Sequence, residues 1–223
     1  MRFWGMVVFG VLGTAILLSL GIWQLQRLAW KQEVLRAIES KILAPAVEIP
    51  QTVLPDAHSL LPVRAEGRYK GDTVRVLVSQ KIYGAGYRLI TAFELVDGRT
   101  IMLDRGFTSV RSKIPSTPEG RGQVIGNLQW PQEIDSFTPE NDLAANIWFA
   151  RDVARLAEHL KAEPVLLVLR DSSFETEAAT PLPKMTANIP NDHMNYAITW
   201  FSLALIWLGM SGYFLYRSRD PQS

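Results

Sequence analysis

The stretch Asn191-Asp-His-Met-Asn-Tyr-Ala-Ile-Thr-Trp-Phe201 opens the segment that decides the fold, an uncharged run that continues to Tyr216. Between Asp192 and Arg217 there are 24 residues without a formal charge. As a helix, residues 196–216 would span about 31 Å, which is the thickness of the hydrocarbon core of a bilayer. We therefore predict a transmembrane helix over residues 193–216 and a cytoplasmic tail over residues 217–223.

Polar side chains gather where this predicted helix begins. His193, Ala197 and Trp200 share one helical face, because they stand at positions i, i+4 and i+7. Two interpretations follow. His193 is either an ordinary interfacial histidine, with Asn191 or Asp192 capping the helix, or the ligand of a group that lies partly in lipid.

The amino-terminal segment repeats the pattern of the carboxy-terminal one. Another 24 uncharged residues lie between Arg2 and Arg27, with Trp4 and Trp23 near the two ends. The segment lacks the short apolar core and the small-residue cleavage site of a signal peptide. We predict an uncleaved transmembrane helix over residues 1–26.

Two spans place both termini on one side of the membrane. Arg217 and Arg219 follow the second span and favour cytoplasmic termini. Arg27, Lys31 and Arg36 follow the first span and favour the opposite orientation. We retain cytoplasmic termini, a periplasmic central domain and a location in the bacterial inner membrane.

Small and hydroxyl side chains mark one stripe on each predicted span, and we expect these two stripes to face each other. The first stripe consists of Gly10, Gly13, Leu17, Gly21 and Gln24, and the second of Asn195, Thr199, Ser202, Ile206 and Gly209.

The central region, residues 27–192, is predicted to be a single β-rich domain. The apolar period of four predicts a helical extension over residues 27–43, and four prolines mark a connector over 44–62. From residue 63 the period changes to two, which predicts a sheet with a helix over 63–170 and a polar return loop over 171–192. Strands are expected at 63–69, 73–79, 87–96, 100–110, 123–130, 147–150 and 165–169, with turns at 70–72 and 97–99 and a helix at 151–162. The fold class is thus an α+β membrane protein with a mostly antiparallel, barrel- or sandwich-like domain between two transmembrane helices.

Composition and motif content narrow the classes of function. Arg2, Arg217, Arg219 and Asp220 lie beyond the two spans, and the rest of the chain has 20 basic and 21 acidic residues. A surface that binds nucleic acid needs a strong basic excess, so this class of function is excluded. The chain has no cysteine, and its three histidines do not stand in a metal-binding spacing. Asp104 and Arg105 lie within a predicted strand, where a structural ion pair is the preferred interpretation. We predict no catalytic residue.

Three ordered motifs resemble those of the surfeit locus protein family. The first is Gly21-Ile-Trp-Gln-Leu-Gln-Arg27 with Trp30-Lys31, at the end of the first span. The second is the hairpin Gly86-Tyr-Arg-Leu-Ile-Thr-Ala-Phe93, Asp97-Gly98-Arg99 and Leu103-Asp-Arg-Gly-Phe107. The third is the stretch 191–201. The resemblance implies a non-enzymatic factor that assists the assembly of haem-copper oxidases.

The resemblance also implies a cofactor, haem a, and a ligand for it, because His193 matches a histidine linked to haem a binding in bacterial members. We expect Trp200 and Trp23 to wall the ring, and the partners to be the catalytic subunit of the oxidase, other assembly factors and the bilayer. Two alternatives stay open: a scaffold that stabilises an oxidase intermediate without haem, and a membrane-anchored periplasmic enzyme. The choice between a cytochrome c and a quinol oxidase as client is open as well.

Overall fold

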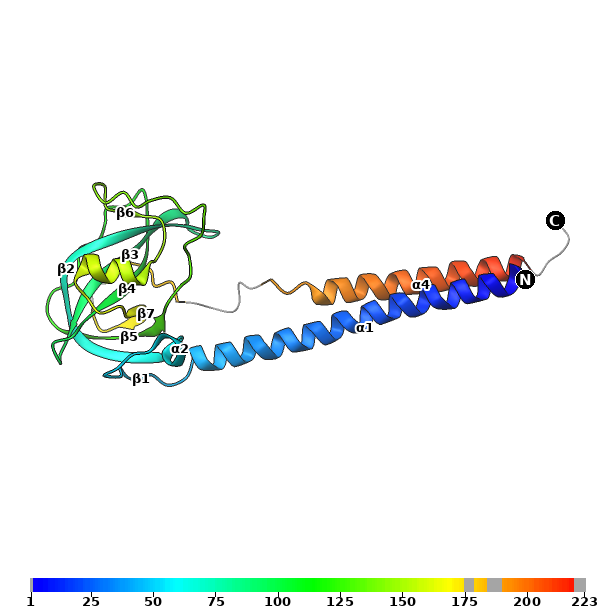
Figure 1. Ribbon diagram of the computed structural model, residues 1–223, viewed down its shortest axis with the longest axis horizontal. Helices are drawn as coiled ribbons and strands as arrows, with labels where there is room; N and C mark the ends of the chain where they lie inside the picture. Colours follow the sequence, from blue (N-terminus) through cyan, green and yellow to red (C-terminus); the bar gives the residue numbers. More distant parts are fainter. Residues whose placement is uncertain (1, 175–178, 184–189, 219–223) are drawn as a thin grey trace. The chain divides into compact units, whose positions relative to one another are not determined.

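A computed structural model describes residues 2–174, 179–183 and 190–218 (Figure 1). The chain forms two compact units, Met1–Glu39 with Thr186–Ser223, and Ser40–Met185. Its helices are α1 (Arg2–Ile42), α2 (Pro55–His58), α3 (Val153–Leu160) and α4 (His193–Arg217). Its strands are β1 (Val47–Glu48), β2 (Pro62–Gln80), β3 (Gly84–Leu95), β4 (Thr100–Ser109), β5 (Gly122–Gln129), β6 (Ile147–Trp148) and β7 (Leu166–Ser172).

The first unit pairs α1 with α4, which run side by side (Figure 1). Both helices are long and apolar enough to cross a membrane. The predicted span 1–26 and its predicted extension 27–43 form one uninterrupted helix that ends at Ile42. The predicted second span agrees with α4, whose last residue, Arg217, begins the predicted tail; residues 219–223 of that tail lie outside the described part of the chain.

The packed face of α1 follows a heptad. Alternate steps of four and three residues connect the buried and half-buried positions Phe3, Val7, Gly10, Thr14, Leu17, Gly21, Gln24, Leu28 and Lys31, and the half-buried Gly13 lies beside this seam. This period keeps one seam of a helix against its partner in a left-handed pair. The stripe predicted on α1 is therefore confirmed.

The stripe predicted on α4 is wrong. Thr199, Ile206 and Gly209 are exposed, and no atom lies within 4 Å of the position that a Gly209 side chain would take. The Thr199 hydroxyl donates to the Asn195 carbonyl of its own helix at 2.9 Å, so it does not need a partner on α1. The packed face instead consists of His193, Ala197, Trp200, Phe201, Ala204, Trp207 and Ser211, of which the two alanines are buried.

Glycines of α1 receive the large side chains of α4. A side chain at Gly21 would start 2.7 Å from the ring of Phe201, and one at Gly13 would overlap the indole of Trp207. At these two contacts a large ring of α4 packs on a glycine of α1, so the prediction of small and hydroxyl residues on both sides misplaced the α4 seam.

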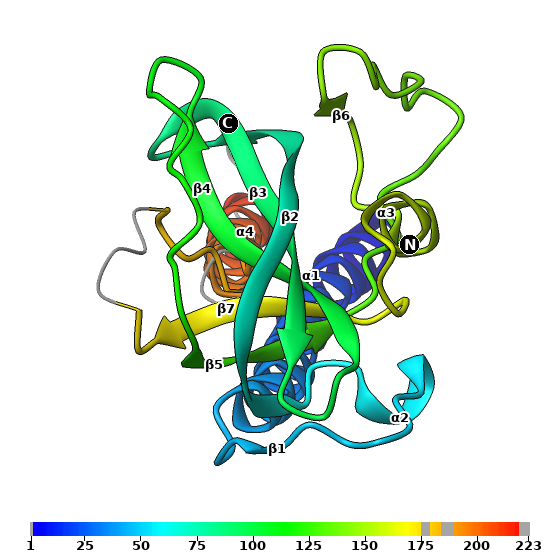
Figure 2. The same cartoon turned by 90° about the vertical axis from the view of Figure 1, so that its left-hand side faces the viewer.

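The second unit is a seven-stranded sheet with the order β1-β2-β3-β4-β7-β5, and β6 pairs with β2 (Figure 2). The long strand β2 curves, so that residues 62–67 pair with β5 and residues 67–80 pair with β3. Three of the pairings, β1–β2, β2–β6 and β4–β7, are parallel. The α+β class is confirmed, and the four longest pairings are antiparallel, as expected. The domain is a mixed, curled sheet and not a closed barrel, whereas a barrel- or sandwich-like arrangement was expected.

Two apolar clusters cover the two faces of the sheet. Ile101 and Leu103 of β4 contribute to one cluster, and Met102 between them contributes to the other, as the period of a strand requires. Helix α3 covers the second cluster with Val153, Leu156 and Ala157. Its amino terminus is capped by Asp152, whose carboxylate accepts from the amides of Ala154 and Arg155.

Several predicted boundaries change. The turn expected at residues 70–72 is a bulge within one continuous strand, where Gly71 takes a φ of 72°. The hairpin at residues 97–99 is confirmed, with Gly98 at a φ of 88°. The connector 44–62 contains β1 and α2, and β7 extends to Ser172, into the predicted return loop 171–192. Residues 175–178 and 184–189 of that loop lie outside the described residues.

Candidate functional site

A hydrogen bond joins the two helices of the first unit at the start of α4. The Nδ1 atom of His193 lies 2.7 Å from the Oε1 atom of Gln24 on α1. An amide oxygen only accepts hydrogen bonds, so Nδ1 carries the hydrogen and donates it. A neutral imidazole holds one hydrogen, so Nε2 keeps a free lone pair and is the nitrogen available to a metal ion.

The surroundings of this pair are packed on one side and open on the other. Gln24 is 8% exposed, and Ala197, one turn after His193, is 1% exposed. His193 itself is half-buried, so its ring reaches the surface. The hydrogen bond between Gln24 and His193 thus joins a buried side chain of α1 to a histidine that a ligand can still reach.

The predicted capping of α4 is not observed. Asp192 occupies the position before the helix without a side-chain hydrogen bond, and the Oδ1 atom of Asn191 is buried without a hydrogen-bond partner. A buried acceptor of this kind is costly in an apolar environment. Asn191 thus has an acceptor without a hydrogen bond two residues before His193.

A cation lies close to the entrance of α4. The Nζ atom of Lys31 donates to the carbonyl oxygen of Pro190 at 2.5 Å. Lys31 follows Gln24 by seven residues, so both belong to the packed face of α1. The Arg27 guanidinium, by contrast, lies 4.6 Å from the centre of the Trp30 ring. The sequence signal that could have identified Lys31 is its heptad spacing from Gln24.

The two tryptophans predicted to wall a ring take different positions. Trp200 is half-buried on the same face of α4 as His193, two turns further along the helix. Trp23 is 49% exposed and is adjacent to the buried Gln24, so it points away from the seam. Their predicted role stays a prediction.

The other histidines are engaged in the second unit. The Nδ1 atom of His58 accepts from the amide of Leu54 at 2.9 Å, and the ring of His159 packs 5.4 Å from that of Trp148. Within the described ranges, no group of three metal-ligating side chains occurs.

Asp104 lies at the centre of a buried ion network in the sheet. It is fully buried, and it accepts from Arg88 Nε at 2.6 Å and from the amide of Gly106 at 3.1 Å, with Arg151 Nη1 at 3.5 Å. Arg151 also donates to Glu133 through Nε at 3.0 Å. Burial raises the pKa of Glu133, but the hydrogen bonds and charge of Arg151 outweigh burial and hold it below its usual value. Every member of this network has a partner, which confirms the structural interpretation of Asp104.

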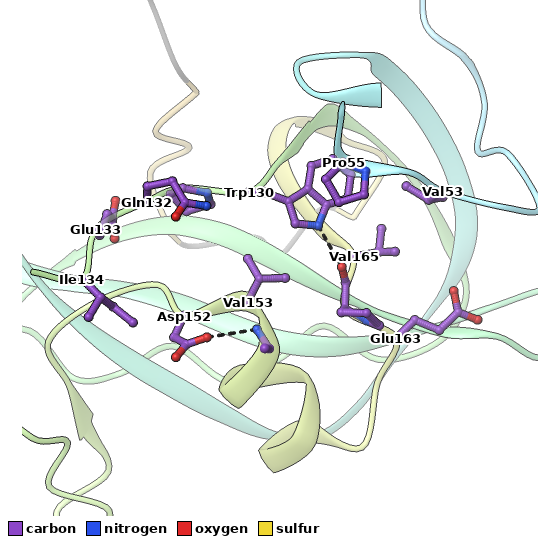
Figure 3. Close-up of a pocket in the computed structure, with 13 residues that line it drawn as sticks. Val53, Pro55, Trp130, Gln132, Glu133, Ile134, Asp152, Val153, Glu163 and Val165 are labelled. Carbon is purple, nitrogen blue, oxygen red and sulfur yellow. Dashed lines mark hydrogen bonds between the residues drawn. The ribbon is translucent and has the colours of Figure 1, made fainter. Parts of the chain in front are cut away.

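The second unit also has an apolar groove beside α3, with a volume of about 430 Å³ (Figure 3). Its polar groups are largely engaged within the protein: the Trp130 indole donates to Pro164 O at 2.9 Å, and Asp152 caps α3. The groove therefore presents mainly the apolar faces of Trp130, Ile134, Val153 and neighbouring prolines.

Comparison with known proteins identifies the family. The sequence model of the SURF1 family matches residues 11–205. The chain belongs to the SURF1 family. The matched region of this SURF1 family protein includes the sheet, Gln24 and His193.

Individual relatives agree with this assignment. A SURF1-like protein of Rickettsia prowazekii is 30% identical over 94% of the chain and 88% of its own length. The SURF1-like protein of Rickettsia felis is 28% identical over 85% of the chain and 88% of its own length. Surfeit locus protein 1 of Homo sapiens is 29% identical over 83% of the chain and 69% of its own length.

Proposed function

We propose that this SURF1 family protein assists the assembly of a haem-copper terminal oxidase by binding haem a through His193 and passing it to the catalytic subunit. Family membership supports the general role. The observation that carries the specific role is the place of His193, half-buried at the start of α4 and with Nδ1 2.7 Å from Gln24 Oε1, so that Nε2 of the neutral ring is the nitrogen free to bind a metal.

The chemistry of haem a fits this position. Its iron takes an imidazole nitrogen as an axial ligand. Its long apolar tail favours lipid and its two propionates favour water, so it belongs at the surface of a membrane. His193 begins an apolar helix of 25 residues, and Lys31 supplies a positive charge beside the same helix start. His193 would therefore hold the iron, while Lys31 is suited to attract a propionate.

We also propose an orientation in the membrane. α1 and α4 cross the bacterial inner membrane with both termini in the cytoplasm, and the sheet domain lies in the periplasm. The protein acts by binding and transfer, without catalysing a reaction of its own. Its partners are the oxidase catalytic subunit, further assembly factors and the bilayer.

A second candidate function is favoured by the groove beside α3. Its exposed apolar surface around Trp130 suits contact with another protein, so the chain could stabilise an oxidase intermediate without binding haem (Figure 3). In that case His193 would only link α4 to α1.

The haem content of the oxidase separates these two functions. Cells that make haem a and lack this chain are complemented with the wild type, with His193→Ala or with His159→Ala as a matched control. We expect the wild type and the control to restore the haem a content of the purified oxidase, and His193→Ala to leave it several-fold lower. Full restoration by His193→Ala would favour the scaffold.

A further inference from the structure

We infer that Gln24 is a positioning residue that sets the tautomer of His193 and so prepares Nε2 for iron. This inference rests on the proposed function, because it assigns a role to Gln24 in the same site. It also adds a link that the proposed function does not contain: the competence of the ligand depends on the pairing of α1 with α4.

The first step is the polarity of Gln24. A primary amide that is 8% exposed within an apolar helix pair requires a hydrogen-bond partner, because burial without one is unfavourable. Gln26, two residues later, is exposed and has no such requirement. The partner of Gln24 is the Nδ1 atom of His193, at 2.7 Å.

The second step is the direction of the bond. In water, a neutral imidazole prefers to carry its hydrogen on Nε2, where it blocks the nitrogen that would bind iron. The Gln24 oxygen reverses this preference, because it accepts only from a hydrogen on Nδ1. The acceptor on the far nitrogen also raises the basicity of the nitrogen that binds the metal.

The third step is the register of the two helices. Gly10 faces Ser211 and Gly21 faces Phe201, and these close contacts fix how α4 lies along α1. Gln24 follows Gly21 by three residues on the same face, so the register brings its side chain opposite His193. A shift between the helices would separate donor and acceptor and allow the other tautomer.

Three variants isolate this role. Gln24→Leu fills similar space and removes the acceptor. Gln24→Met has an unbranched side chain of similar length with only a weak acceptor, and it serves as a second variant if the leucine disturbs insertion. Gln24→Glu retains an acceptor oxygen and should rescue the site.

The experiment reads the tautomer and the affinity separately, on the full chain in nanodiscs. Nitrogen-15 spectra of histidine-labelled protein without haem, assigned by the signal lost in His193→Ala, report which ring nitrogen carries hydrogen. We expect Nδ1–H in the wild type and Gln24→Glu, and Nε2–H in Gln24→Leu and Gln24→Met. Titration with haem a should show affinity 10- to 100-fold weaker for Gln24→Leu than for the wild type, as is typical when a hydrogen-bond partner of a ligand is removed, and near-wild-type affinity for Gln24→Glu.

The outcomes distinguish the inference from the proposed function. If the wild type binds haem a, but Gln24→Leu and Gln24→Met keep the Nδ1–H tautomer and the wild-type affinity, the role of Gln24 is overturned and the proposed function stands. If the wild type does not bind haem a at all, both are overturned, whatever the tautomer.

Discussion

Trp207 of α4 donates its indole N–H to the backbone carbonyl oxygen of Gly10 of α1 at 3.1 Å, across 197 positions of the sequence. The same carbonyl also accepts from the hydroxyl of Thr14 at 2.8 Å. The absence of a side chain at Gly10 leaves this oxygen accessible, so the beginning and the end of the chain are joined within the helix pair. The interactions of Gln24 with His193 and of Gly10 with Trp207 lie 14 residues apart on each helix, which is about 21 Å along the pair.

This register predicts a disulfide between introduced cysteines. The side chain at Gly10 would start 3.1 Å from the Cβ atom of Ser211, just below the range of about 3.5–4.5 Å between the Cβ atoms of a disulfide, so a small outward shift brings the two cysteines into range. The double variant Gly10→Cys, Ser211→Cys should crosslink efficiently under mild oxidation, measured as a mobility shift on gels. The chain has no native cysteine, so the assay has no background from other thiols of the chain.

The matched control for this crosslink is Gly10→Cys with Gly209→Cys. No atom lies within 4 Å of a side chain at Gly209, so this pair should remain reduced. Crosslinking of the control at the same rate, or none of the Ser211 pair, would contradict the register.

The close approach at Gly13 predicts that a larger side chain weakens the pair. Gly13→Leu must displace the indole of Trp207, and overpacking of this kind costs about 1–3 kcal/mol. We expect a lower unfolding temperature in detergent and a lower yield of the Gly10–Ser211 crosslink. Gly5→Leu is the control, because nothing lies within 4 Å of a side chain at Gly5 and its effect should be small.

The ion network in the sheet predicts a large effect at Asp104. Asp104→Asn removes the negative charge next to Arg88 and Arg151, and removal of one partner of a buried pair costs about 3–5 kcal/mol. Tryptophan fluorescence of the full chain during denaturation should show this loss. Asp97→Asn alters a more exposed ion pair with Arg99 and should cost about 1 kcal/mol or less. Equal effects of the two substitutions would contradict the central place of Asp104.

Glu133 predicts how stability changes in acid. The partners of Glu133 lower its pKa in the folded protein below the ordinary value of 4.5, despite its partial burial. Its contribution is therefore fully present above about pH 4.5 and is lost as the pH falls through the folded pKa. Glu133→Gln should reduce stability at neutral pH by about 1 kcal/mol, with the difference from the wild type shrinking below pH 4.5. A difference that stays constant down to pH 3 would show that the charge of Glu133 is not responsible.

The elements that sequence reasoning found are those with a strong local signal. The apolar runs predicted both terminal helices, and the period of two predicted the central strands, because burial on two faces leaves alternate residues in separate clusters. The bulge at Gly71 was predicted as a turn, since glycine next to aspartate is typical of both. The curl of β2 depends on pairing with β5, about 60 residues away, which no local pattern reports.

Only the part of the candidate site that has a local sequence signal was predicted. His193 could be selected from its place at the start of a span and from the family resemblance. Gln24 was assigned to the packed stripe of α1, but its partner could not be predicted, because the α4 seam was chosen by small and hydroxyl residues. The hydroxyl of Thr199 bonds to its own helix, and the seam combines large rings with Ala197, Ala204 and Ser211. Only the three-dimensional register brings Gln24 and His193 together.

The absorption spectrum of the full-length protein, purified from cells that make haem a, tests most directly the claim that His193 holds the iron. The wild type and His159→Ala should show the bands of haem a, and His193→Met should retain part of them, because methionine can also ligate haem iron. His193→Ala should insert normally, form the Gly10–Ser211 crosslink when the cysteines are added, and lose the bands by tenfold or more. A His193→Ala protein that retains the wild-type haem a spectrum and stoichiometry would contradict the claim.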